Sequence, residues 1–447
     1  MEIVIKLSQF LLSLSLLIIL HELGHFIPAK IFKTRVEKFY LFFDVKYSLF
    51  KKKIGETEYG IGWLPLGGYV KISGMIDESM DKEQMALPPQ PWEFRSKPAW
   101  QRLIIMLGGV TVNFILAFVI YIGMAFAYGD IYLNNSELKD GIAVTSSVGE
   151  ELGLKTGDKI IAVDGEKIAH FDEIPMKLLF SKSALVIRDG AEQTINFPVD
   201  LIDKVLKGEK RPFIGIREPF MVAMVPDTSA NSKVLQSKDI IQSLNGTPTK
   251  YADQVMAFLK ANKNTTADAV VLRAEKEVPV KVQINKEGKL GVGIASVGIK
   301  SLEKLGYYKF STQKYGFLES FPVGIEKGTS QLVGYGKQLK AIFNPDTGAY
   351  KGVGGFKAIF DIFPSTWSWE VFWNITALLS IMLGVMNLLP IPALDGGHVM
   401  FLLYEMISGR KPSDKFLENA QMVGFFLLIT LLLFANGNDI YKAIVGK

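Results

Sequence analysis

Residues 3–25 read IVIKLSQFLLSLSLLIILHELGH, an apolar run that ends in two histidines and a glutamate. A transmembrane helix needs about 20 mostly apolar residues, and Ile3–Leu20 comes close to that length. A cleaved signal peptide is the alternative, but the stretch has no basic segment before its apolar core and no small-residue cleavage site. The stretch therefore predicts a membrane helix that is not cleaved off and that ends in ionisable side chains.

Three further apolar stretches lie along the chain, which is 49% hydrophobic over 447 residues. They are Leu103–Tyr128, Val371–Leu389 and Met422–Phe434, the last extended by flanking residues. The sequence between the second and the third reads like that of a water-soluble protein. The net charge of +5 is too small for this length to indicate nucleic-acid binding. We therefore predict a polytopic α-helical membrane protein with four transmembrane helices.

Lysine and arginine predict the orientation, because cytoplasmic loops are enriched in them. They are frequent between the first two spans and in the short connection between the last two, whereas both termini have few. The residues are Lys30, Lys33, Arg35, Lys38, Lys46, Lys51, Lys52, Lys53, Arg95, Lys97 and Arg102, and Arg410, Lys411 and Lys415. Both connections are expected in the cytoplasm, and the termini and the middle region outside. At a rise of about 1.5 Å per residue, His21 lies roughly 27 Å beyond Ile3, near the cytoplasmic face of the hydrocarbon layer.

The middle region contains an internal repeat. Leu154–Gly165 (LKTGDKIIAVDG) aligns with Leu235–Gly246 (LQSKDIIQSLNG), about 80 residues further on. Asp-Gly and Asn-Gly after a short apolar run are typical of a strand that enters a tight turn. The spacing is that of a small domain and predicts two β-rich modules. Generic hairpins are one interpretation; the favoured one is a pair of PDZ domains, because the first copy resembles the bacterial PDZ type.

These patterns divide the chain into five parts. They are 1–129, membrane core with two spans and a cytoplasmic, membrane-associated β-hairpin; 130–209, first PDZ-like domain; 210–297, second PDZ-like domain; 298–368, membrane-proximal linker with surface helices; and 369–447, membrane core with the other two spans.

His21–His25 matches the pattern H-E-x-x-H. Positions i and i+4 of a helix lie on one face, so both imidazoles can reach one zinc ion. Glu22 lies beside them, where a carboxylate can take a proton from the attacking water and pass it to the leaving amine. Coincidence is the alternative, but ionisable residues inside a membrane helix are costly and usually functional. The chain has no cysteine, so a metal here needs histidine and carboxylate ligands.

Catalytic zinc takes a third protein ligand and keeps one position open. The candidate is Asp395, in the segment NLLPIPALDGGH at residues 387–398. The first and third spans run in the same direction and each motif follows the end of its span, so Asp395 reaches the membrane face where the histidines lie. A helix N-cap role for Asp395 and zinc ligation by His398 remain alternatives. His170 is interpreted as a surface residue, and we predict one zinc ion per chain.

Taken together, H-E-x-x-H after the first span, N-x-x-P-x-x-x-L-D-G after the third and the paired β modules between the second and third resemble the site-2 protease family of intramembrane zinc metalloproteases. The similarity covers essentially the whole chain, including PLGGYVKI at 65–72 and FRSKPAWQR at 94–102. It is strongest to the bacterial branch with tandem PDZ domains, typified by the regulator of sigma-E protease. The resemblance implies that His21, His25 and Asp395 bind zinc and that Glu22 is the catalytic base.

The same resemblance implies substrates and a location. The substrates are single-pass membrane proteins already trimmed by a first protease, such as anti-sigma factors, and leftover signal peptides. The location is the bacterial cytoplasmic (inner) membrane. The resemblance also places Asn387 and Asn113 beside the substrate; for Asn113 the alternative is helix packing next to Gly108 and Gly109.

Residues 58–72, EYGIGWLPLGGYVKI, are typical of a hairpin around Pro-Leu-Gly-Gly. Beside the zinc ion, the free edge of this hairpin offers backbone groups to which an unwound substrate can add as a strand. We therefore take Gly67, Gly68, Tyr69 and Val70 as substrate-binding residues. The resemblance implies the same, since the family has a membrane-reentrant β element here. A cytoplasmic hairpin that only packs is the alternative.

Two other classes of protein compete with a protease. A membrane-anchored PDZ scaffold with a vestigial metal site has no need of Glu22 beside the histidines. A metal transporter places its ligands near the midplane and often has repeated membrane halves, whereas here the site is near one face and the spans show no repeat. The predicted partners are therefore membrane-protein substrates and the lipid bilayer, with no nucleic acid.

Overall fold

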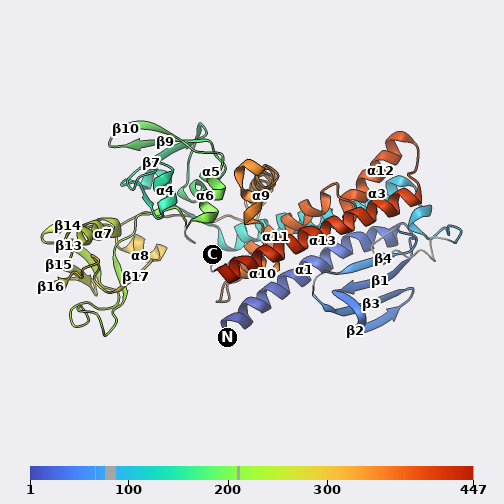
Figure 1. Ribbon diagram of the computed structural model, residues 1–447. Helices are drawn as coiled ribbons and strands as arrows, with labels where there is room; N and C mark the ends of the chain where they lie inside the picture. The colour runs from blue at the N-terminus through green and yellow to red at the C-terminus, as the bar shows by residue number, and fades with distance from the viewer. Residues whose placement is uncertain (66, 76–86, 209–211, 446–447) are drawn as a thin grey trace. The chain divides into compact units, whose positions relative to one another are not determined.

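The computed structural model describes residues 1–65, 67–75, 87–208 and 212–445. The chain divides into two compact units (Figure 1). The helical unit comprises Met1–Gly129, Lys314–Lys340 and Lys351–Lys447, and the β unit comprises Asp130–Gln313 and Ala341–Tyr350. Leu66, in the turn of the predicted hairpin, and the predicted domain boundary between residues 209 and 210 lie outside the described residues.

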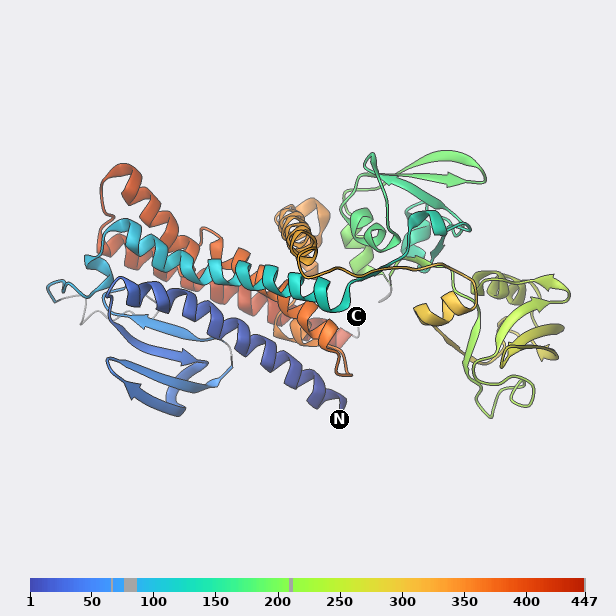
Figure 2. The same cartoon turned by 180° about the vertical axis from the view of Figure 1, so that it is seen from behind.

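Long apolar helices build the helical unit (Figure 2). They are α1 (Glu2–Ile31), α3 (Ala99–Tyr128), α11 (Trp369–Leu388) and α13 (Asp414–Val445), with the shorter α12 (Asp395–Ser408) between the last two. Within the described residues, these four long helices are long and apolar enough to cross a membrane, so the four predicted spans are confirmed as helices. The first continues past its apolar core through the H-E-x-x-H motif, which keeps both histidines on one helical face.

The helices α1, α3 and α11 pack into one core. A Cβ atom at Gly24 of α1 would lie 2.4 Å from the carbonyl oxygen of Gly108 of α3, so the two backbones touch where these helices cross. Further along α1, the hydroxyl oxygens of Ser13 and Thr376 of α11 lie 2.9 Å apart. The crossing of α1 and α3 therefore lies next to the predicted zinc ligands.

A four-stranded sheet lies against α1. Its strands are β1 (Val36–Leu41), β2 (Phe43–Ile54), β3 (Thr57–Leu64) and β4 (Tyr69–Ile72). The order is β2-β3-β1-β4, so β4 is an edge strand. The predicted hairpin of residues 58–72 is therefore wrong: β3 and β4 are strands, but β1 lies between them and pairs with both. The reason is packing, because the fully buried Tyr40 of β1 lies against Gly60 of β3 and stacks on Tyr69 of β4.

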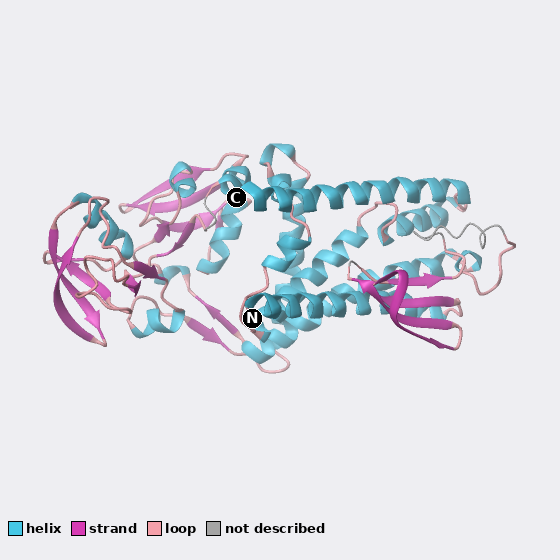
Figure 3. Ribbon diagram, turned by 60° about the horizontal axis from the view of Figure 1, so that its bottom comes forward, coloured by secondary structure: helices cyan, strands magenta, loops and turns pink. Residues whose placement is uncertain are grey.

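The β unit holds most of the remaining strands (Figure 3). The first β module contains β6 (Ile142–Val144), α4 (Ser147–Glu151), β7 (Lys159–Val163), β8 (Glu166–Lys167), α5 (Ile174–Leu179), β9 (Ser183–Arg188), β10 (Ala191–Asn196), α6 (Leu201–Lys207) and β11 (Ile214–Ile216). The second contains β12 (Met221–Met224), β13 (Ile240–Leu244), β14 (Thr247–Pro248), α7 (Ala252–Ala261), β15 (Thr266–Arg273), β16 (Lys276–Gln283) and β17 (Gly293–Ala295). The main sheets run β10-β9-β7-β8 and β16-β15-β13-β12-β17, and each module has its own apolar core.

Equivalent contacts in the two modules confirm the internal repeat. In the first copy, Arg188 donates two hydrogen bonds of 2.7 Å to the carboxylate of Asp158. In the second, Arg273 donates bonds of 2.8 and 2.7 Å to Asp239. Both aspartates are buried. The two sequence copies therefore fold into the same buried arginine–aspartate pair.

The predicted linker, 298–368, contains several elements. They are α8 (Ile299–Lys304), β18 (Ser311–Gln313), which pairs with β5 (Asp130–Tyr132), α9 (Ser320–Ile342) and α10 (Phe356–Asp361). Two glycines of α9 contact α3: a Cβ atom at Gly324 or Gly328 would lie 2.5 Å from Ile122 or Phe118. The small residues thus let α9 approach the second span closely.

Candidate metal centre

His21 and His25 of α1 meet Asp395, the first residue of α12. The Nε2 atoms of the two histidines are 3.3 Å apart. Asp395 Oδ2 lies 3.4 Å from His21 Nε2 and 3.3 Å from His25 Nε2. The three atoms form a nearly equilateral triangle, built from the residues that the sequence motifs predicted.

This triangle fits a zinc ion. Zinc bonds of about 2.0–2.1 Å at tetrahedral angles separate two ligand atoms by about 3.3 Å, as here. The histidines are buried, and Asp395 Oδ2 has no hydrogen-bond partner in the described structure. A buried carboxylate oxygen that faces two imidazole nitrogens in this way needs a cation. Among the described residues, His21, His25 and Asp395 are the one group of this kind close enough to share an ion.

The loop between α11 and α12 places Asp395 beside the two histidines. Residues 389–394 leave the helical path, and Ala393 has a φ of +74°. Gly396 and Gly397 lie so close to carbonyl oxygens of this loop that a Cβ atom at either would clash. The preceding residue is the helix N-cap, so Asp395 is not a cap and its carboxylate faces the histidines.

Helix α3 contacts the other ring nitrogens. His25 Nδ1 lies 2.8 Å from the carbonyl oxygen of Ile105, which can only accept, so His25 carries its proton on Nδ1 and its lone pair on Nε2. His21 Nδ1 lies 3.0 Å from the side-chain amide of Asn113. Between these contacts, Gly109 leaves room for both rings, because a Cβ atom there would lie 2.4 Å from His25 Nε2.

A cavity of about 530 Å³ opens beside the cluster. Glu22 lines it together with His21, His25 and Asp395, and Gly68, Tyr69 and Val70 line it from the sheet. Gly68, just before β4, lies beside Glu22, since a Cβ atom at Gly68 would lie 3.7 Å from Glu22 Cγ. The edge strand β4 therefore begins next to Glu22.

The other predicted substrate residues lie elsewhere. Gly67 packs against the ring of Phe43. Asn113 is fully buried behind His21, and the Asn387 amide nitrogen lies 3.4 Å from His21 Nε2. None of these three is among the described residues that line the cavity. His170 belongs to the β unit, and the prediction of a surface position is only partly met, because its ring is half-buried against Tyr132.

A polar network at the cavity was not predicted from the sequence. Tyr69 donates a 2.8 Å hydrogen bond to Asp44, and Lys38 lies 3.4 Å from the same carboxylate. Burial alone would raise the pKa of Asp44, but the Tyr69 hydroxyl and the Lys38 ammonium outweigh it and lower this pKa below its usual value. The network therefore presents an ionised carboxylate and an ammonium group to the cavity.

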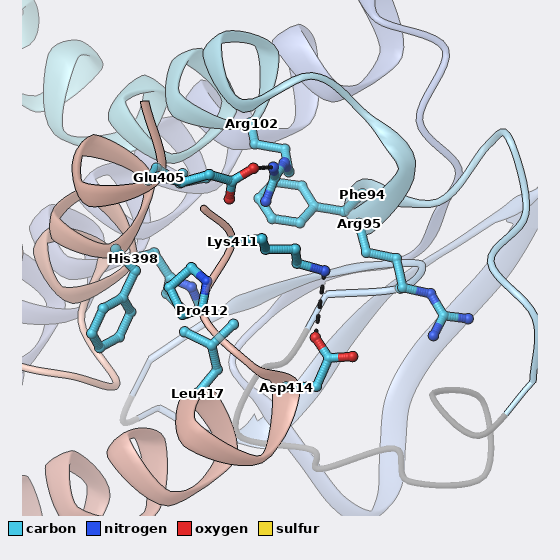
Figure 4. A pocket seen from close by; sticks show the side chains of 12 residues that line it. Phe94, Arg95, Arg102, His398, Glu405, Lys411, Pro412, Asp414 and Leu417 are labelled. Atoms are coloured by element: carbon cyan, nitrogen blue, oxygen red, sulfur yellow. Dashed lines mark hydrogen bonds and ion pairs between the residues drawn. The ribbon is translucent and has the colours of Figure 1, made fainter. Parts of the chain in front are cut away.

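Gln421 of α13 was also missed. It is buried, lines the cavity, and its Nε2 lies 2.5 Å from His398 Nε2. His398 is therefore bound to the fourth long helix and is not part of the metal-binding group. His398 also lines a smaller pocket (Figure 4), where Arg102 of α3 and Glu405 of α12 form a 2.5 Å ion pair. One signal was available: Gln421 is the last polar residue before the apolar stretch Met422–Phe434.

Two histidines and a glutamate on α1 and an aspartate at the start of α12 lie beside one cavity, which is the arrangement of a metallohydrolase. Four helices of the described chain are able to cross a membrane. The sequence profile of peptidase family M50 matches residues 9–431, and the chain belongs to this family. The regulator of sigma-E protease RseP of Escherichia coli (strain K12) is 28% identical over 462 residues, which cover 97% of this chain and 98% of that protein.

Two further relatives have names of the same kind. The regulator of sigma E protease of Haemophilus influenzae is 28% identical over 469 residues, covering 98% of this chain and 99% of its own. A candidate zinc metalloprotease of Rickettsia conorii is 27% identical over 443 residues, covering 96% and 97%. A solved PDZ domain of an SdrC-like protein from Listeria monocytogenes matches 19% of this chain and 92% of that domain, at 19% identity and a TM-score of 0.16. The predicted family is confirmed, and the protein is a zinc metalloprotease.

Proposed function

We propose that this zinc metalloprotease hydrolyses peptide bonds inside the membrane, within the transmembrane segments of single-pass membrane proteins. The observation that carries the proposal is the place of the metal-binding residues. His21 and His25 lie on a helix apolar enough to cross a membrane, and Asp395 follows the end of another such helix. Burying ionisable groups on such helices is costly, and a protease that cuts soluble segments has no need of it.

The chemistry is general acid–base catalysis beside a metal ion. His21, His25 and Asp395 would hold the zinc ion, which when bound polarises the scissile carbonyl and lowers the pKa of a water molecule. Glu22 takes a proton from the attacking water as the water oxygen bonds to the carbonyl carbon. The carbon–nitrogen bond then breaks, and Glu22 gives the proton to the leaving amine.

The substrate must be unwound before it is cut, because the peptide bonds of a helix are shielded and their hydrogen bonds are satisfied internally. The edge strand β4 borders the same cavity as Glu22, so a segment that adds to its free edge as a strand would bring its backbone next to the base. Gly68, Tyr69 and Val70, which line the cavity, are the residues that would meet this strand. Asn387, close to His21, would meet it on the metal side.

The proposed setting is the bacterial cytoplasmic membrane, with the termini and the β unit outside and the metal centre near the cytoplasmic face. The distribution of lysine and arginine between the long helices supports this orientation. The two β modules act as PDZ-like domains. We infer that the substrate is of the anti-sigma-factor kind and is cut in a second step, after a first protease has trimmed it. The E. coli and H. influenzae relatives are named as regulators of sigma-E, which agrees with a role in sigma-factor control.

Glu22→Gln tests the proposal. In proteoliposomes containing a single-pass substrate, this variant should keep about one zinc ion per chain and lose cleavage by about 10²-fold or more. Glu2→Gln, on the same helix and exposed, is the matched control and should cut normally. Mass spectrometry of the products should place the cut within the apolar segment. Cutting only in water-soluble loops, or full activity of Glu22→Gln, would contradict the proposal.

A further inference from the structure

One face of α3 stands behind both zinc-binding histidines. Ile105, Gly109 and Asn113 follow one another at intervals of four residues, so they lie on one helical stripe. The Ile105 carbonyl contacts His25, Gly109 leaves space for both rings, and the Asn113 side chain contacts His21. Each histidine therefore meets α3 through its Nδ1 and the metal site through its Nε2.

A histidine that binds zinc through Nε2 must carry its proton on Nδ1. For His25 this is ensured, because its Nδ1 faces a carbonyl oxygen that can only accept. For His21 the neighbour is an amide, which offers either an acceptor, Oδ1, or a donor, Nδ2. Only the oxygen can accept the Nδ1 proton. The chemistry of the site therefore requires one orientation of Asn113.

The surroundings of Asn113 allow that orientation. The side chain is fully buried, its Nδ2 lies 3.0 Å from His21 Nδ1, and its Oδ1 has no hydrogen-bond partner in the described structure. Rotating the amide by half a turn exchanges the two atoms at nearly the same positions. Because Oδ1 has no partner, the rotation breaks no hydrogen bond of this oxygen. The backbone stays fixed during this rotation, because Asn113 lies in the middle of α3.

We propose that Asn113 is a positioning residue that accepts the Nδ1 proton of His21 through Oδ1 and thereby fixes the zinc-binding tautomer. The second long helix thus sets the proton position of both histidines. The proposal rests on the proposed zinc site and gives Asn113 a role other than substrate contact. It concerns metal affinity, which is measured without any substrate.

Three variants of the full-length protein test it, by zinc affinity in competition with a chelator. Asn113→Asp keeps an acceptor and should bind zinc within a few-fold of the wild type. Asn113→Leu has a similar size but no acceptor and should bind roughly 10–100-fold more weakly. Ser380→Ala removes a bond to the Asn113 backbone without touching His21, so it controls for packing and should leave zinc affinity unchanged. Thermal unfolding of the zinc-free proteins checks that each variant folds.

Two results would overturn the role of Asn113. One is wild-type affinity in Asn113→Leu; the other is an Asn113→Asp variant as weak as Asn113→Leu, which would mean that a donor is required. Neither result would contradict the proposed zinc site itself. A wild type that binds no zinc would instead overturn the proposed function together with this inference.

The tautomer can also be observed directly. The chain has 4 histidines, so ¹⁵N-histidine labelling gives a simple spectrum of the ring nitrogens. In the zinc-loaded wild type, His21 Nδ1 should carry a proton, and its signal should shift in Asn113→Leu but stay in place in Ser380→Ala. A His21 Nδ1 without a proton in the zinc-loaded protein would overturn the proposal.

Discussion

Gly109 is the residue at which the metal centre tolerates least change. A Cβ atom there would lie 2.4 Å from His25 Nε2 and 2.6 Å from His21 Cε1, well inside contact distance. We expect Gly109→Ala to push both rings off the triangle and to weaken zinc binding by more than about tenfold, with a matching loss of cleavage. Gly123→Ala is the control on the same helix, because nothing lies within 4 Å of its added Cβ atom. Equal zinc affinity in both variants would show that the rings move freely.

Asp395 and His398 are the two candidates for the third zinc ligand. Asp395 Oδ2 points at both histidines without a hydrogen bond of its own, whereas His398 is engaged by Gln421. Asp395→Ala should therefore lose most bound zinc, as measured by metal analysis after dialysis. His398→Ala should keep about one ion per chain. The reverse pattern would make His398 the ligand.

At the scale of elements, strand addition to the free edge of β4 predicts that every second residue of the substrate forms hydrogen bonds with the enzyme. Alternate backbone amides of a strand point to the same side, so only every second residue of an added substrate can donate to β4. We expect N-methylation of alternate residues near the cut to slow cleavage of a synthetic substrate by about tenfold, since each hydrogen bond contributes ~0.5–1.5 kcal/mol and the methyl group adds a clash. The residues between them serve as controls. An even response along the peptide would argue against strand addition.

The arginine–aspartate pair of the second β module joins two of its strands. Asp239 is completely buried, next to β13, and Arg273 ends β15. Removing the guanidinium leaves a buried charge without its partner, which typically costs about 3–5 kcal/mol. Arg273→Ala should therefore make this module much more sensitive to limited proteolysis, while Lys276→Ala, exposed on β16, should change its stability by less than about 0.5 kcal/mol. Similar digestion of the two variants would contradict this account.

At the scale of the whole molecule, the orientation can be tested with single cysteines, because the native chain has none. Lys52 of β2 and Lys167 of β8 are both exposed and lie on opposite sides of the membrane in the proposed topology. In intact cells, a membrane-impermeant thiol reagent should label Lys167→Cys and leave Lys52→Cys unlabelled until the membrane is opened. The opposite pattern would move the metal centre to the outer face.

The sequence predicted what local composition determines. The four spans follow from apolar length, and His21, His25 and Asp395 follow from motifs whose spacing is set by helix geometry. Prediction from the sequence failed for features that depend on tertiary packing. Nothing in residues 58–72 indicates that β1, earlier in the chain, lies between β3 and β4. The contact of Gln421 with His398 depends on how two helices are rotated, which an apolar stretch leaves open.

The metal-binding group joins distant parts of the chain. The contact between Asn387 and His21 alone spans 366 residues. During synthesis, the ribosome therefore releases His21 and His25 long before Asp395 is made. A nascent chain with only its first two helices in the membrane has histidines but no complete zinc site. We therefore expect the protease to be unable to cut its neighbours until the chain has been made at least as far as Asp395.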